Sequence, residues 1–576
     1  MVNLTIDNRE VQVPEGTTIL DAAKTAGIFL PTLCFLEGIN DIGTCRVCLV
    51  EVEGAQRLVT SCNTHAEEGM VIYTNSPRAR EARKVNVELI LSQHDASCAS
   101  CVRSQTCALQ TLSNDLGIIE NAYKKNITYG KWDKNFPLIR HESKCIKCMR
   151  CVQLCNNMQQ IGVWDSINSG SRVTVGIFDG RKPTETHCVL CGQCITHCPV
   201  GALRERDDTD RAFEAIGDPE KVTVVQIAPA VRAAWGESLG LAREDATIGR
   251  LITAFRRIGF DYIYDTSLTA DLTVIEEGRE FIELLKEGDE SKFPLVTSCC
   301  PGWVRFLKSN YPDMLPLMST AKSPQQMFGV LAKTVIARQL GVDPSNVFCV
   351  SVMPCIAKKS ECDLPTMKNY RKTPDVDIVL TTREIDRMIR TCHINPTNLE
   401  EGEFDLVEGF GFSSGAGVIF GATGGVMEAA LRSVYYMVTG ETPDLEAFYN
   451  IRGDEGWREA TFEVAGMPVN VAIASGIGNA RKLVEAIRRG DAKYHFVEVM
   501  TCPGGCAGGG GQPIKPNREQ AEERKDNLYY LDRAAAVRFS HENPSITKLY
   551  EHNPDISYGL HTNHFAWDMP KNPFIR

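Results

Sequence analysis

Hydrophobic and polar residues alternate along the first 13 positions of the chain, with a break at Asp7-Asn8. Alternation with a period of two is typical of half-buried strands, and Asp and Asn are favoured turn residues, so this stretch predicts a β-hairpin. A Pro-Glu-Gly-Thr sequence at 14–17 then introduces a helical run over 19–26. Two strands followed by a helix indicate a β-grasp domain, and a charge-rich helical stretch at 78–92 comes after it.

The pattern changes after position 209. Apolar, β-branched runs now alternate with helical segments. Such runs are typical of strands that are buried on both faces, as in the parallel sheets of α/β proteins. Binding sites in these folds form beyond the carboxyl ends of the strands. The predicted strands are 222–227, 347–352, 378–381, 469–474 and 496–500.

The composition is that of a globular protein, with 43% hydrophobic and 23% charged residues, and it excludes a fibrous or disordered chain. At roughly 150 residues per domain, 576 residues predict about four domains. The net charge of −11 provides no basic surface for nucleic acid. The sequence contains no basic and apolar leader and no run of 18 apolar residues. We therefore expect a cytoplasmic protein without a membrane span.

Cysteine departs from this ordinary picture. The chain has 23 cysteines, and 15 of them lie between Cys34 and Cys198. Disulfides need an oxidising compartment, whereas clustered cysteines in a reducing one are typical of metal ligation. The alternative, that these are small buried hydrophobic residues, does not account for the regular spacing.

The first cysteine set follows the predicted β-grasp. Cys34, Cys45, Cys48 and Cys62 form the pattern C-x10-C-x2-C-x13-C. This is a long-looped relative of the plant-type spacing for a 2Fe-2S cluster. A C-x2-C pair alone also suits zinc, but four cysteines after a β-grasp pattern favour the 2Fe-2S cluster.

The second set combines a histidine with three cysteines, His94, Cys98, Cys101 and Cys107. Imidazole and thiolate also suit zinc, so the spacing leaves both metals open. The position of the set, between the 2Fe-2S pattern and a ferredoxin-like segment, favours a 4Fe-4S cluster. A histidine ligand raises the potential of such a cluster because it removes negative charge.

The third set repeats the bacterial ferredoxin run C-x2-C-x2-C-x3-C. In two-cluster ferredoxins, the fourth cysteine of each run ligates the other cluster. One predicted 4Fe-4S ligand set is Cys145, Cys148, Cys151 and Cys198, and the other is Cys188, Cys191, Cys194 and Cys155. With His94, the four predicted clusters use all 15 cysteines of this half.

These patterns predict a multidomain α/β protein with α+β accessory modules. We expect a 2Fe-2S β-grasp domain at 1–78, a small 4Fe-4S domain with one histidine and three cysteine ligands at 79–125, a two-4Fe-4S ferredoxin-like domain at 126–209 and an α/β catalytic domain at 210–576. A chain of clusters moves single electrons and performs no bond chemistry. The reaction is therefore assigned to the last domain, where we expect two parallel-sheet lobes around the active site.

Three cysteine motifs follow apolar runs of that domain. They are TSCCPGW at 297–303, MPCIAKKSE at 353–361 and EVMTCPGGCA at 498–507, the last followed by glycines through Gly511. In this order they resemble the three signatures of the iron-iron (FeFe) hydrogenases. The front clusters resemble those of the large clostridial type, so the resemblance extends over the whole chain.

The resemblance implies an H-cluster, in which a 4Fe-4S cubane is joined to a diiron unit with CO, cyanide and azadithiolate ligands. The cubane ligands it implies are Cys300, Cys355, Cys502 and Cys506, and Cys506 also bridges to the diiron unit. Lys358 is implied to donate to a cyanide, since a compact ammonium suits an anionic acceptor. The other implied cofactor-binding residues are Pro229, Ala230, Pro324, Gln325, Met353 and Met500.

The implied reaction is the reversible reduction of protons to H2. Cys299 is implied to hand protons to the cofactor, because a thiol titrates close enough to neutrality to do so. Glu277, Ser319 and Glu280 are implied to continue the route. The outer basic residue of the family is not matched, because Leu284 stands at its position. Four histidines near the carboxyl terminus, His541, His552, His561 and His564, are interpreted as surface residues.

Three function classes fit the patterns to different degrees. A hydrogenase catalytic subunit accounts for all of them. A hydrogenase-like protein of iron-sulfur assembly or sensing is disfavoured, because such relatives tend to lose the relay cysteine, and this chain has Cys299, Lys358 and Glu361. An electron-transfer subunit resembling the iron-sulfur subunit of complex I leaves the four cysteines of the last domain unexplained.

The electron partner is open at this stage. No Gly-x-Gly-x-x-Gly or flavin motif is present, so nicotinamide chemistry belongs to another subunit. Residues 44–54 resemble the front of hydrogenase subunits that assemble with NAD(P)H-oxidising flavoproteins. The expected partners are ferredoxin or NAD(P)H-oxidising flavin and iron-sulfur subunits, together with H2, protons and hydrogenase maturation proteins.

Overall fold

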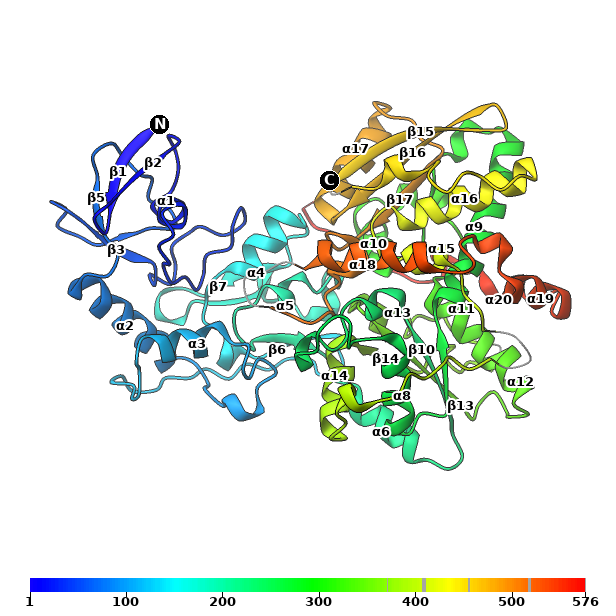
Figure 1. Cartoon of the computed structure of the whole chain (residues 1–576), viewed down its shortest axis with the longest axis horizontal. Coiled ribbons are helices and arrows are strands. Elements are labelled where there is room, and N and C mark those ends of the chain that lie inside the picture. The colour runs from blue at the N-terminus through cyan, green and yellow to red at the C-terminus, as the bar shows by residue number, and fades with distance from the viewer. Residues whose placement is uncertain (370, 407–410, 454–455, 516–519, 575–576) are drawn as a thin grey trace. The chain divides into compact units, whose positions relative to one another are not determined.

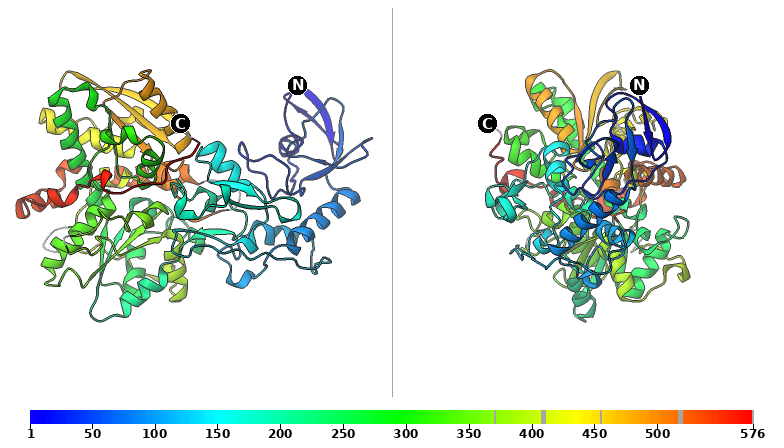
Figure 2. Two further views of the ribbon diagram at one scale, coloured as in Figure 1. Left: turned by 180° about the vertical axis from the view of Figure 1, so that it is seen from behind. Right: turned by 90° about the vertical axis from the view of Figure 1, so that its left-hand side faces the viewer.

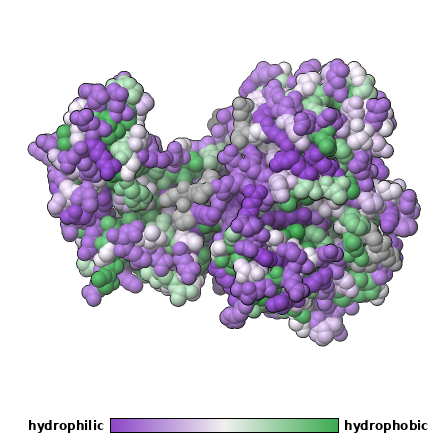
Figure 3. Space-filling view, viewed as in Figure 1, coloured by the Kyte–Doolittle hydropathy of each residue, from purple (hydrophilic) through white to green (hydrophobic). Residues whose placement is uncertain are grey.

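The structure is a computed structural model of the chain, and it describes residues 1–369, 371–406, 411–453, 456–515 and 520–574. It divides into two compact units (Figure 1). The first comprises Met1–Thr184, Gln193–Arg204 and Ile514–Arg518, and the second comprises Glu185–Gly192, Glu205–Pro513 and Glu519–Arg576. Within the described ranges, no helix is both long and apolar enough to span a membrane. Hydrophilic side chains predominate on the face drawn in Figure 3, and hydrophobic ones gather in smaller patches.

The first unit begins with the predicted hairpin. β1 (Val2–Ile6) and β2 (Arg9–Val13) pair antiparallel around Asp7 and Asn8. Both turn residues have positive φ, 45° and 65°, which Asp and Asn tolerate better than most side chains. The full sheet has the order β2-β1-β5-β3-β4, where β3 is Leu49–Val52, β4 is Val59–Thr60 and β5 is Val71–Tyr73.

Two helices complete this part of the first unit. α1 (Ile19–Thr25) is capped by Thr18, whose side chain accepts the backbone N–H of Asp21, and its apolar residues pack in the core of the sheet. α2 (Pro77–Ser92) lies where the charge-rich helix is predicted. The buried guanidinium of Arg83 donates from Nη2 to the carbonyl oxygen of Leu49 at 2.6 Å, and so joins α2 to β3.

The rest of the first unit consists of short elements. β7 and β8 form an antiparallel pair. Such short elements bury little apolar surface by themselves. Most of this segment is loop, and many of its cysteines lie in the loops. The elements are α3 (Ala108–Asp115), β6 (Leu138–Arg140), α4 (Arg150–Gln153), β7 (Trp164–Ile167), β8 (Thr174–Ile177) and α5 (Gln193–Thr196).

The second unit contains two four-stranded sheets in separate lobes (Figures 1 and 2), with α15 and α18 between them. One sheet has the order β11-β10-β13-β14, and all of its pairs are parallel. Its strands are β10 (Val222–Ile227), β11 (Tyr262–Asp265), β13 (Val347–Met353) and β14 (Ile378–Thr381). The predictions for β10, β13 and β14 are confirmed, whereas the four-residue β11 is missed.

The other sheet has the order β12-β17-β16-β15. Its strands are β12 (Leu295–Val296), β15 (Trp457–Val464), β16 (Met467–Ser475) and β17 (Phe496–Met500). β16 pairs parallel with β17 but antiparallel with β15, so the prediction of two wholly parallel lobes is wrong. Only Ala465 and Gly466 join β15 to β16, and so short a connection permits only antiparallel pairing.

Helices cover both sheets. The longest, α9 (Ser267–Glu287), is buried along its first three turns, and its Phe281 stacks on Phe496 of β17 with ring centroids 5.0 Å apart. The others are α6 (Thr209–Gly217), α7 (Pro229–Arg232), α8 (Ile248–Ile258), α10 (Pro301–Asn310), α11 (Pro324–Leu331), α12 (Ala337–Gln339), α13 (Ala357–Glu361), α14 (Thr382–Thr391), α15 (Gly415–Ile419), α16 (Gly425–Thr439), α17 (Ile477–Arg489), α18 (Ala521–Ala534), α19 (Pro544–His552) and α20 (Ser557–Leu560).

Candidate active site

The three cysteine motifs of the second unit begin where parallel strands end. β12 leads to Cys299 and Cys300, β13 leads to Cys355, and β17 leads to Cys502. Cys300 is the N-cap residue of α10, and Pro301 stands at the first helical position, where proline is favoured. Both sheets therefore deliver cysteines from their carboxyl ends, where α/β proteins place their sites.

These ends surround a cavity of about 80 Å³. All six residues that were predicted to contact the cofactor line it, namely Pro229, Ala230, Pro324, Gln325, Met353 and Met500. Cys299, Cys300, Cys355, Cys506 and Lys358 line it as well. Cys502 is buried but does not line the cavity, and its Sγ lies 3.6 Å from the carbonyl oxygen of Cys191. The wall also includes Phe420 and two small residues that the sequence did not single out, Thr266 and Ala270.

The donor set fits an iron-sulfur cluster. Burial and the neighbouring thiol of Cys300 raise the pKa of Cys355 to about 11, and burial beside other thiols also raises the pKa of Cys502 and Cys506. Thiolates crowded into a buried site need a compensating positive charge. Iron supplies that charge when it takes thiolate ligands.

Lys358 reaches the cavity from α13. Its Nζ donates to the carbonyl oxygen of Cys299 at 3.1 Å and to Oε2 of Glu361 at 3.0 Å. The same carboxylate oxygen accepts from Gln325 and Ser323, both at 3.0 Å. Burial disfavours the ammonium charge, but Glu361 and nearby thiols outweigh burial and raise the pKa of Lys358. Lys358 is therefore a charged donor on the wall of the cavity.

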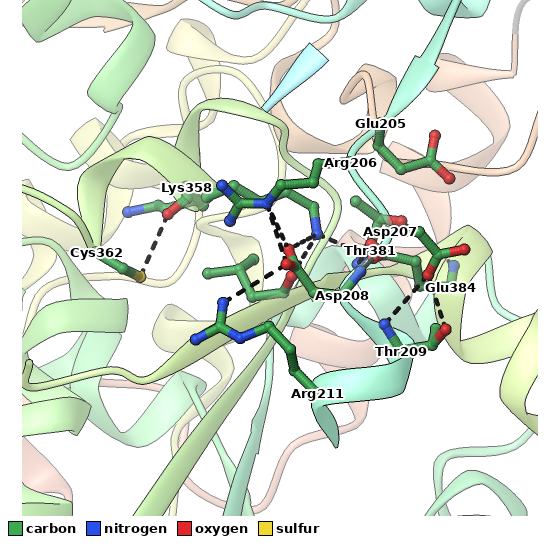
Figure 4. Close-up of polar contacts among 12 residues, drawn as sticks. Glu205, Arg206, Asp207, Asp208, Thr209, Arg211, Lys358, Cys362, Thr381 and Glu384 are labelled. Carbon is green, nitrogen blue, oxygen red and sulfur yellow. Dashed lines mark hydrogen bonds and ion pairs between the residues drawn. The ribbon is translucent and has the colours of Figure 1, made fainter. Parts of the chain in front are cut away.

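A buried ion cluster next to α13 holds this helix in place (Figure 4). Lys359 pairs with Asp208 at 2.7 Å and with Glu384 at 3.0 Å, and all three side chains are almost fully buried. Glu384 also closes a capping box with Thr381 at the start of α14. No local sequence pattern indicates this cluster, because its members lie far apart in the chain.

The glycines after Cys506 pack against other backbone. A Cβ atom on Gly509 would lie 2.2 Å from the carbonyl oxygen of Pro354, and one on Gly511 would lie 2.8 Å from the carbonyl carbon of Pro354. Arg383 donates to the carbonyl oxygen of Gly510 at 2.7 Å. The glycines therefore let the third cysteine motif pack directly against the second.

The predicted relay residues begin at the same wall. Glu277 on α9 is fully buried, and its Oε1 accepts the backbone N–H of Ser298 at 3.3 Å. Its Oε2 is buried without a hydrogen-bond partner among the described residues. Burial and the nearby charge of Glu280 raise the pKa of Glu277 to about 8, so this carboxyl is mostly protonated at neutral pH.

Cys299 differs from the sequence-based expectation. Burial and the nearby charge of Glu277 raise the pKa of the Cys299 thiol well above its ordinary value. The thiol therefore stays protonated at neutral pH. Sequence spacing could not reveal this, since the shift comes from desolvation in the folded protein.

Ser319 and Glu280 are in direct contact. Ser319 Oγ donates to Glu280 Oε2 at 2.6 Å, and the hydroxyl of Thr320 donates to Glu280 Oε1. Burial disfavours the Glu280 carboxylate, but hydrogen bonds from His561, Ser319 and Thr320 outweigh burial and lower its pKa. Glu280 is therefore an ionised acceptor, in contrast to Glu277.

Of the four carboxyl-terminal histidines interpreted as surface residues, His564 is buried, His541 and His561 are half-buried and His552 is exposed, so the interpretation is wrong for His564. His561 contacts Glu276 and Glu280 of α9, at 2.9 and 3.4 Å. His564 is buried, and its Nε2 lies 3.0 Å from the carbonyl oxygen of Ser319. His541 stacks on Tyr436, and His552 alone is exposed. These contacts bridge more than 100 positions of sequence, so no local pattern indicates them.

In the first unit, the cysteines of the predicted 2Fe-2S set lie close to one another. A hydrogen bond joins Cys34 to Cys45 and lowers the pKa of Cys34 to about 7, while a second joins Cys48 to Cys62 and lowers the pKa of Cys48 to about 6. All four thiols are at least half-buried. This arrangement fits a compact cluster site at one end of the sheet.

The second predicted cluster set includes a histidine that is prepared for ligation. Nδ1 of His94 lies 3.0 Å from the carbonyl oxygen of Lys144, to which it donates when protonated. Burial lowers the pKa of His94, so the ring is neutral and its Nε2 has a lone pair for a metal. Burial raises the pKa of Cys107 in the same set.

One ferredoxin-like set lines a small cavity in the first unit, and its members are Cys145, Cys148, Cys151 and Cys198. Burial and neighbouring thiols raise the pKa of Cys148 to about 12. Of the other set, Cys155 and Cys194 belong to the first unit, while Cys188 and Cys191 belong to the second.

Known families match consecutive parts of the chain. Residues 221–510 match the iron-only hydrogenase large subunit, C-terminal domain, and residues 518–555 match the iron hydrogenase small subunit. Residues 1–77 match a 2Fe-2S iron-sulfur cluster binding domain. Residues 83–122 match the NADH-ubiquinone oxidoreductase-G iron-sulfur binding region, and residues 144–202 match a 4Fe-4S dicluster domain.

Individual proteins match over nearly their whole length. The NADP-reducing hydrogenase subunit HndD of Solidesulfovibrio fructosivorans is 45% identical over 562 residues, which cover 96% of this chain and 95% of that protein. Iron hydrogenase 1 of Clostridium pasteurianum is 39% identical over 560 residues, 96% of each chain. A solved structure of [FeFe]-hydrogenase HydA1 from Chlamydomonas reinhardtii is 36% identical, with a TM-score of 0.57 over 63% of this chain and 100% of that one.

The cysteine-lined cavity between two α/β lobes and the accessory cysteine sets define an iron-sulfur oxidoreductase. The chain belongs to the iron-iron (FeFe) hydrogenase family. It is a hydrogenase that relays electrons through iron-sulfur clusters, and the sequence-based predictions of family, mixed α/β fold and activity are confirmed.

Proposed function

We propose that the chain is a catalytic subunit that interconverts protons and H2 and exchanges electrons with an NAD(P)H-oxidising flavin and iron-sulfur partner, with ferredoxin as an alternative or additional partner. The observation that carries the catalytic part is the cavity in which Cys299, Cys300, Cys355, Cys506 and Lys358 converge. The partner is supported by the similarity over nearly the whole chain to a subunit named for NADP reduction.

Cys300, Cys355, Cys502 and Cys506 are the proposed ligands of the active-site cubane. The H-cluster, with its diiron unit attached at Cys506, supplies when bound the redox centre at which two electrons and two protons form H2. Only one thiolate attaches the diiron unit, so the cavity wall has to orient it. Lys358, a charged donor on that wall, offers an N–H to an anionic ligand.

Apolar side chains of the wall exclude water from the site. Met353 and Met500 are both almost fully buried, and they line the cavity beside Pro229 and Pro324. Met side chains adapt to irregular shapes, which suits a bulky inorganic group. A dry wall also strengthens the hydrogen bond that Lys358 donates, because the local dielectric is low.

Protons travel in this proposal between Cys299 and Glu280. Cys299 donates its proton at the cavity and regains one from Glu277, whose Oε2 has no other partner among the described residues. Ser319 carries the proton between Glu277 and Glu280 by donating to one carboxylate while it accepts from the other acid. The buried acids alternate between protonated and ionised states, as a relay requires.

The accessory clusters form the electron path. We assign one 2Fe-2S cluster to Cys34, Cys45, Cys48 and Cys62, and three 4Fe-4S clusters to the His94 set and the two ferredoxin-like sets. The domain boundaries proposed are 1–78, 79–125, 126–209 and 210–576, with a β-grasp as the first domain. The family regions matched along the chain support this division. Hydrogenase maturation proteins are the proposed source of the diiron unit, and the location is cytoplasmic.

Cluster content and activity together test this assignment. Protein reconstituted with iron and sulfide alone should hold about 18 iron atoms, from four 4Fe-4S and one 2Fe-2S cluster, and should be inactive. Insertion of the diiron unit should add two iron atoms, infrared bands of CO and cyanide, and H2 evolution with a reduced viologen dye. H2 evolution before that insertion would refute the proposed active site.

The electron partner needs a separate test. Purification from the native cell under anaerobic conditions should yield flavin-bearing subunits with this chain, and NADH or NADPH should reduce its clusters through them. Recovery of the chain alone, with reduction by ferredoxin and not by NAD(P)H, would favour ferredoxin as the partner.

A further inference from the structure

His561 connects two acidic side chains of α9 to the carboxyl-terminal segment of the chain. It follows α20 directly and lies against Glu276 and Glu280. Its Nε2 is 2.9 Å from Glu276 Oε2, and its Nδ1 is 2.8 Å from the hydroxyl oxygen of Thr320. The same hydroxyl donates to Glu280 Oε1. A continuous set of hydrogen bonds therefore runs from His561 through Thr320 to Glu280 and on to Ser319.

We propose that His561 exchanges protons between solvent and Glu280, with the Thr320 hydroxyl as the bridge. The inference rests on the proposed relay through Glu277, Ser319 and Glu280, and it assigns the outer end of that relay. For H2 formation, the imidazolium gives its Nδ1 proton to the Thr320 hydroxyl while Thr320 gives its own proton to Glu280. The neutral ring then takes a proton from water.

Side-chain exposure increases along the proposed proton path, from Glu277 through Glu280 to His561. The Glu277 side chain is fully buried, the Glu280 side chain is 20% exposed, and the His561 side chain is 28% exposed. Lys286, another basic residue of α9, lies six positions beyond Glu280. At 1.5 Å per residue, this is about 9 Å further along the helix axis. His561 instead touches the relay directly.

The charges around His561 favour the same role. The titratable and charged groups that face it or its partners are Glu276, Glu280 and Arg279 of α9, Tyr550 of α19, and His564. Hydrogen bonds to Glu276 and Glu280 raise the pKa of His561 to about 9, so the ring holds a proton at neutral pH. Arg279 pairs with Glu276 at 3.0 Å.

Glu276 has a supporting role in this arrangement. It accepts from His561, Tyr550, Ser557 and Arg279, so its carboxylate orients the ring without taking part in the path to Ser319. The orientation matters because Nδ1 must face Thr320 for transfer to occur. Glu276 is therefore a positioning residue, and His561 is the proton carrier.

His561→Gln keeps a polar side chain but removes the titrating ring. H2 evolution by the diiron-loaded enzyme should fall by about 10- to 100-fold near pH 7, since one group of an acid-base relay is worth about 10²- to 10⁴-fold and water can enter in part. Iron content and the infrared bands of CO and cyanide should not change. The wild type should lose activity as pH rises through about 9, where His561 loses its proton, and the variant should lack this alkaline limb.

Two further variants separate proton transfer from structure. His561→Ala should regain part of its rate when imidazole is added to the buffer, whereas His552→Gln, at an exposed histidine of the same region, should behave as wild type. Thr320→Val removes the bridge but leaves His561 paired with Glu276 and, at 3.4 Å, with Glu280, so the rate should fall less than in His561→Gln and should not respond to imidazole. If His561→Gln loses iron, the Thr320→Val rate and the rescue experiment decide the question.

The results also distinguish this inference from the proposed function. If Cys299→Ser keeps the full rate, the relay itself is wrong. If Cys299→Ser loses its rate while the His561 and Thr320 variants keep the wild-type rate and pH profile, only the role of His561 is overturned.

Discussion

Cys299 shows at the level of one residue how burial sets a chemical role. The thiol lines the cavity beside Lys358 and Cys300, yet its raised pKa keeps it protonated. A buried neutral thiol donates a proton when a base appears next to it.

Cys299→Ser should reduce H2 turnover by about 10²- to 10⁴-fold, because a hydroxyl is a much weaker acid than a thiol. Iron content and the CO and cyanide infrared bands should persist, whereas Cys300→Ser should disturb the cubane. Cys299→Asp should recover part of the rate that serine loses. Loss of iron from Cys299→Ser would contradict the assignment of this residue as a proton carrier.

Glu277 should make stability depend on pH. Its ordinary pKa of 4.5 is raised to about 8 in the folded protein, so the carboxyl is protonated in both states below pH 4.5. The stability that this buried acid contributes is lost as the pH rises from there through about 8. Glu277→Gln should therefore raise the melting temperature at pH 9 relative to wild type, and should change it little at pH 5. If the melting temperatures of the variant and the wild type differ by the same amount at both pH values, Glu277 is already ionised in the folded protein at pH 5.

At the scale of elements, the site depends on loops that pack against loops. The third cysteine motif leaves β17, and its glycines lie on Pro354 of the second motif. The regular structure in these motifs is short, namely α13 in the second and a 3-10 helix at Gly505–Gly508 in the third. Close backbone packing and the hydrogen bond from Arg383 to Gly510 provide the rigidity.

Gly509→Ala tests this packing. The added methyl group would meet the carbonyl oxygen of Pro354, so one loop has to move, at a cost of about 1 to 3 kcal/mol. We expect a lower melting temperature and loss of the cubane signal in electron paramagnetic resonance. Gly217→Ala is the matched control, since a Cβ there meets nothing within 4 Å. If the two variants have equal melting temperatures, the loops accommodate the added methyl group without a loss of stability.

At the scale of the whole molecule, electrons have to pass through clusters of different potential. In the proposed assignment, the His94 set has one neutral ligand, whereas the other sets have thiolates only. Nδ1 of His94 faces a carbonyl oxygen, so the ring orientation is set before any metal binds. A neutral ligand at this position raises the potential of one step in the chain.

His94→Cys should leave a 4Fe-4S cluster in place and lower its potential, because a thiolate adds negative charge. A redox titration followed by electron paramagnetic resonance would measure the shift. His141→Gln, at another half-buried histidine of the first unit, should leave that potential unchanged. If the site holds zinc and the variant shows no spectroscopic change, the His94 set is a zinc site and not an iron-sulfur cluster site.

The sequence by itself determined much of the architecture and most of the chemistry. Local periodicity predicted the hairpin around Asp7 and Asn8 and the strands β10, β14 and β17. Such periodicity can be read from neighbouring residues alone. The accessory cysteine sets followed from spacing, because a cluster takes several of its ligands a few positions apart, whereas the cubane set followed from the family resemblance. All six predicted cofactor-contact residues line one cavity, and these were predicted from the family resemblance and not from spacing.

Only the tertiary structure decided which distant groups meet and how burial changes them. β11 and β12 are too short for a periodic signal, and β15 turns antiparallel through a two-residue connection. The contact of His561 with Glu276 and Glu280 spans the length of the domain. The opposite protonation of Glu277 and Glu280 depends on desolvation and on hydrogen-bond donors from other elements. These contacts and pKa shifts depend on groups that are distant in sequence and come together only when the chain folds.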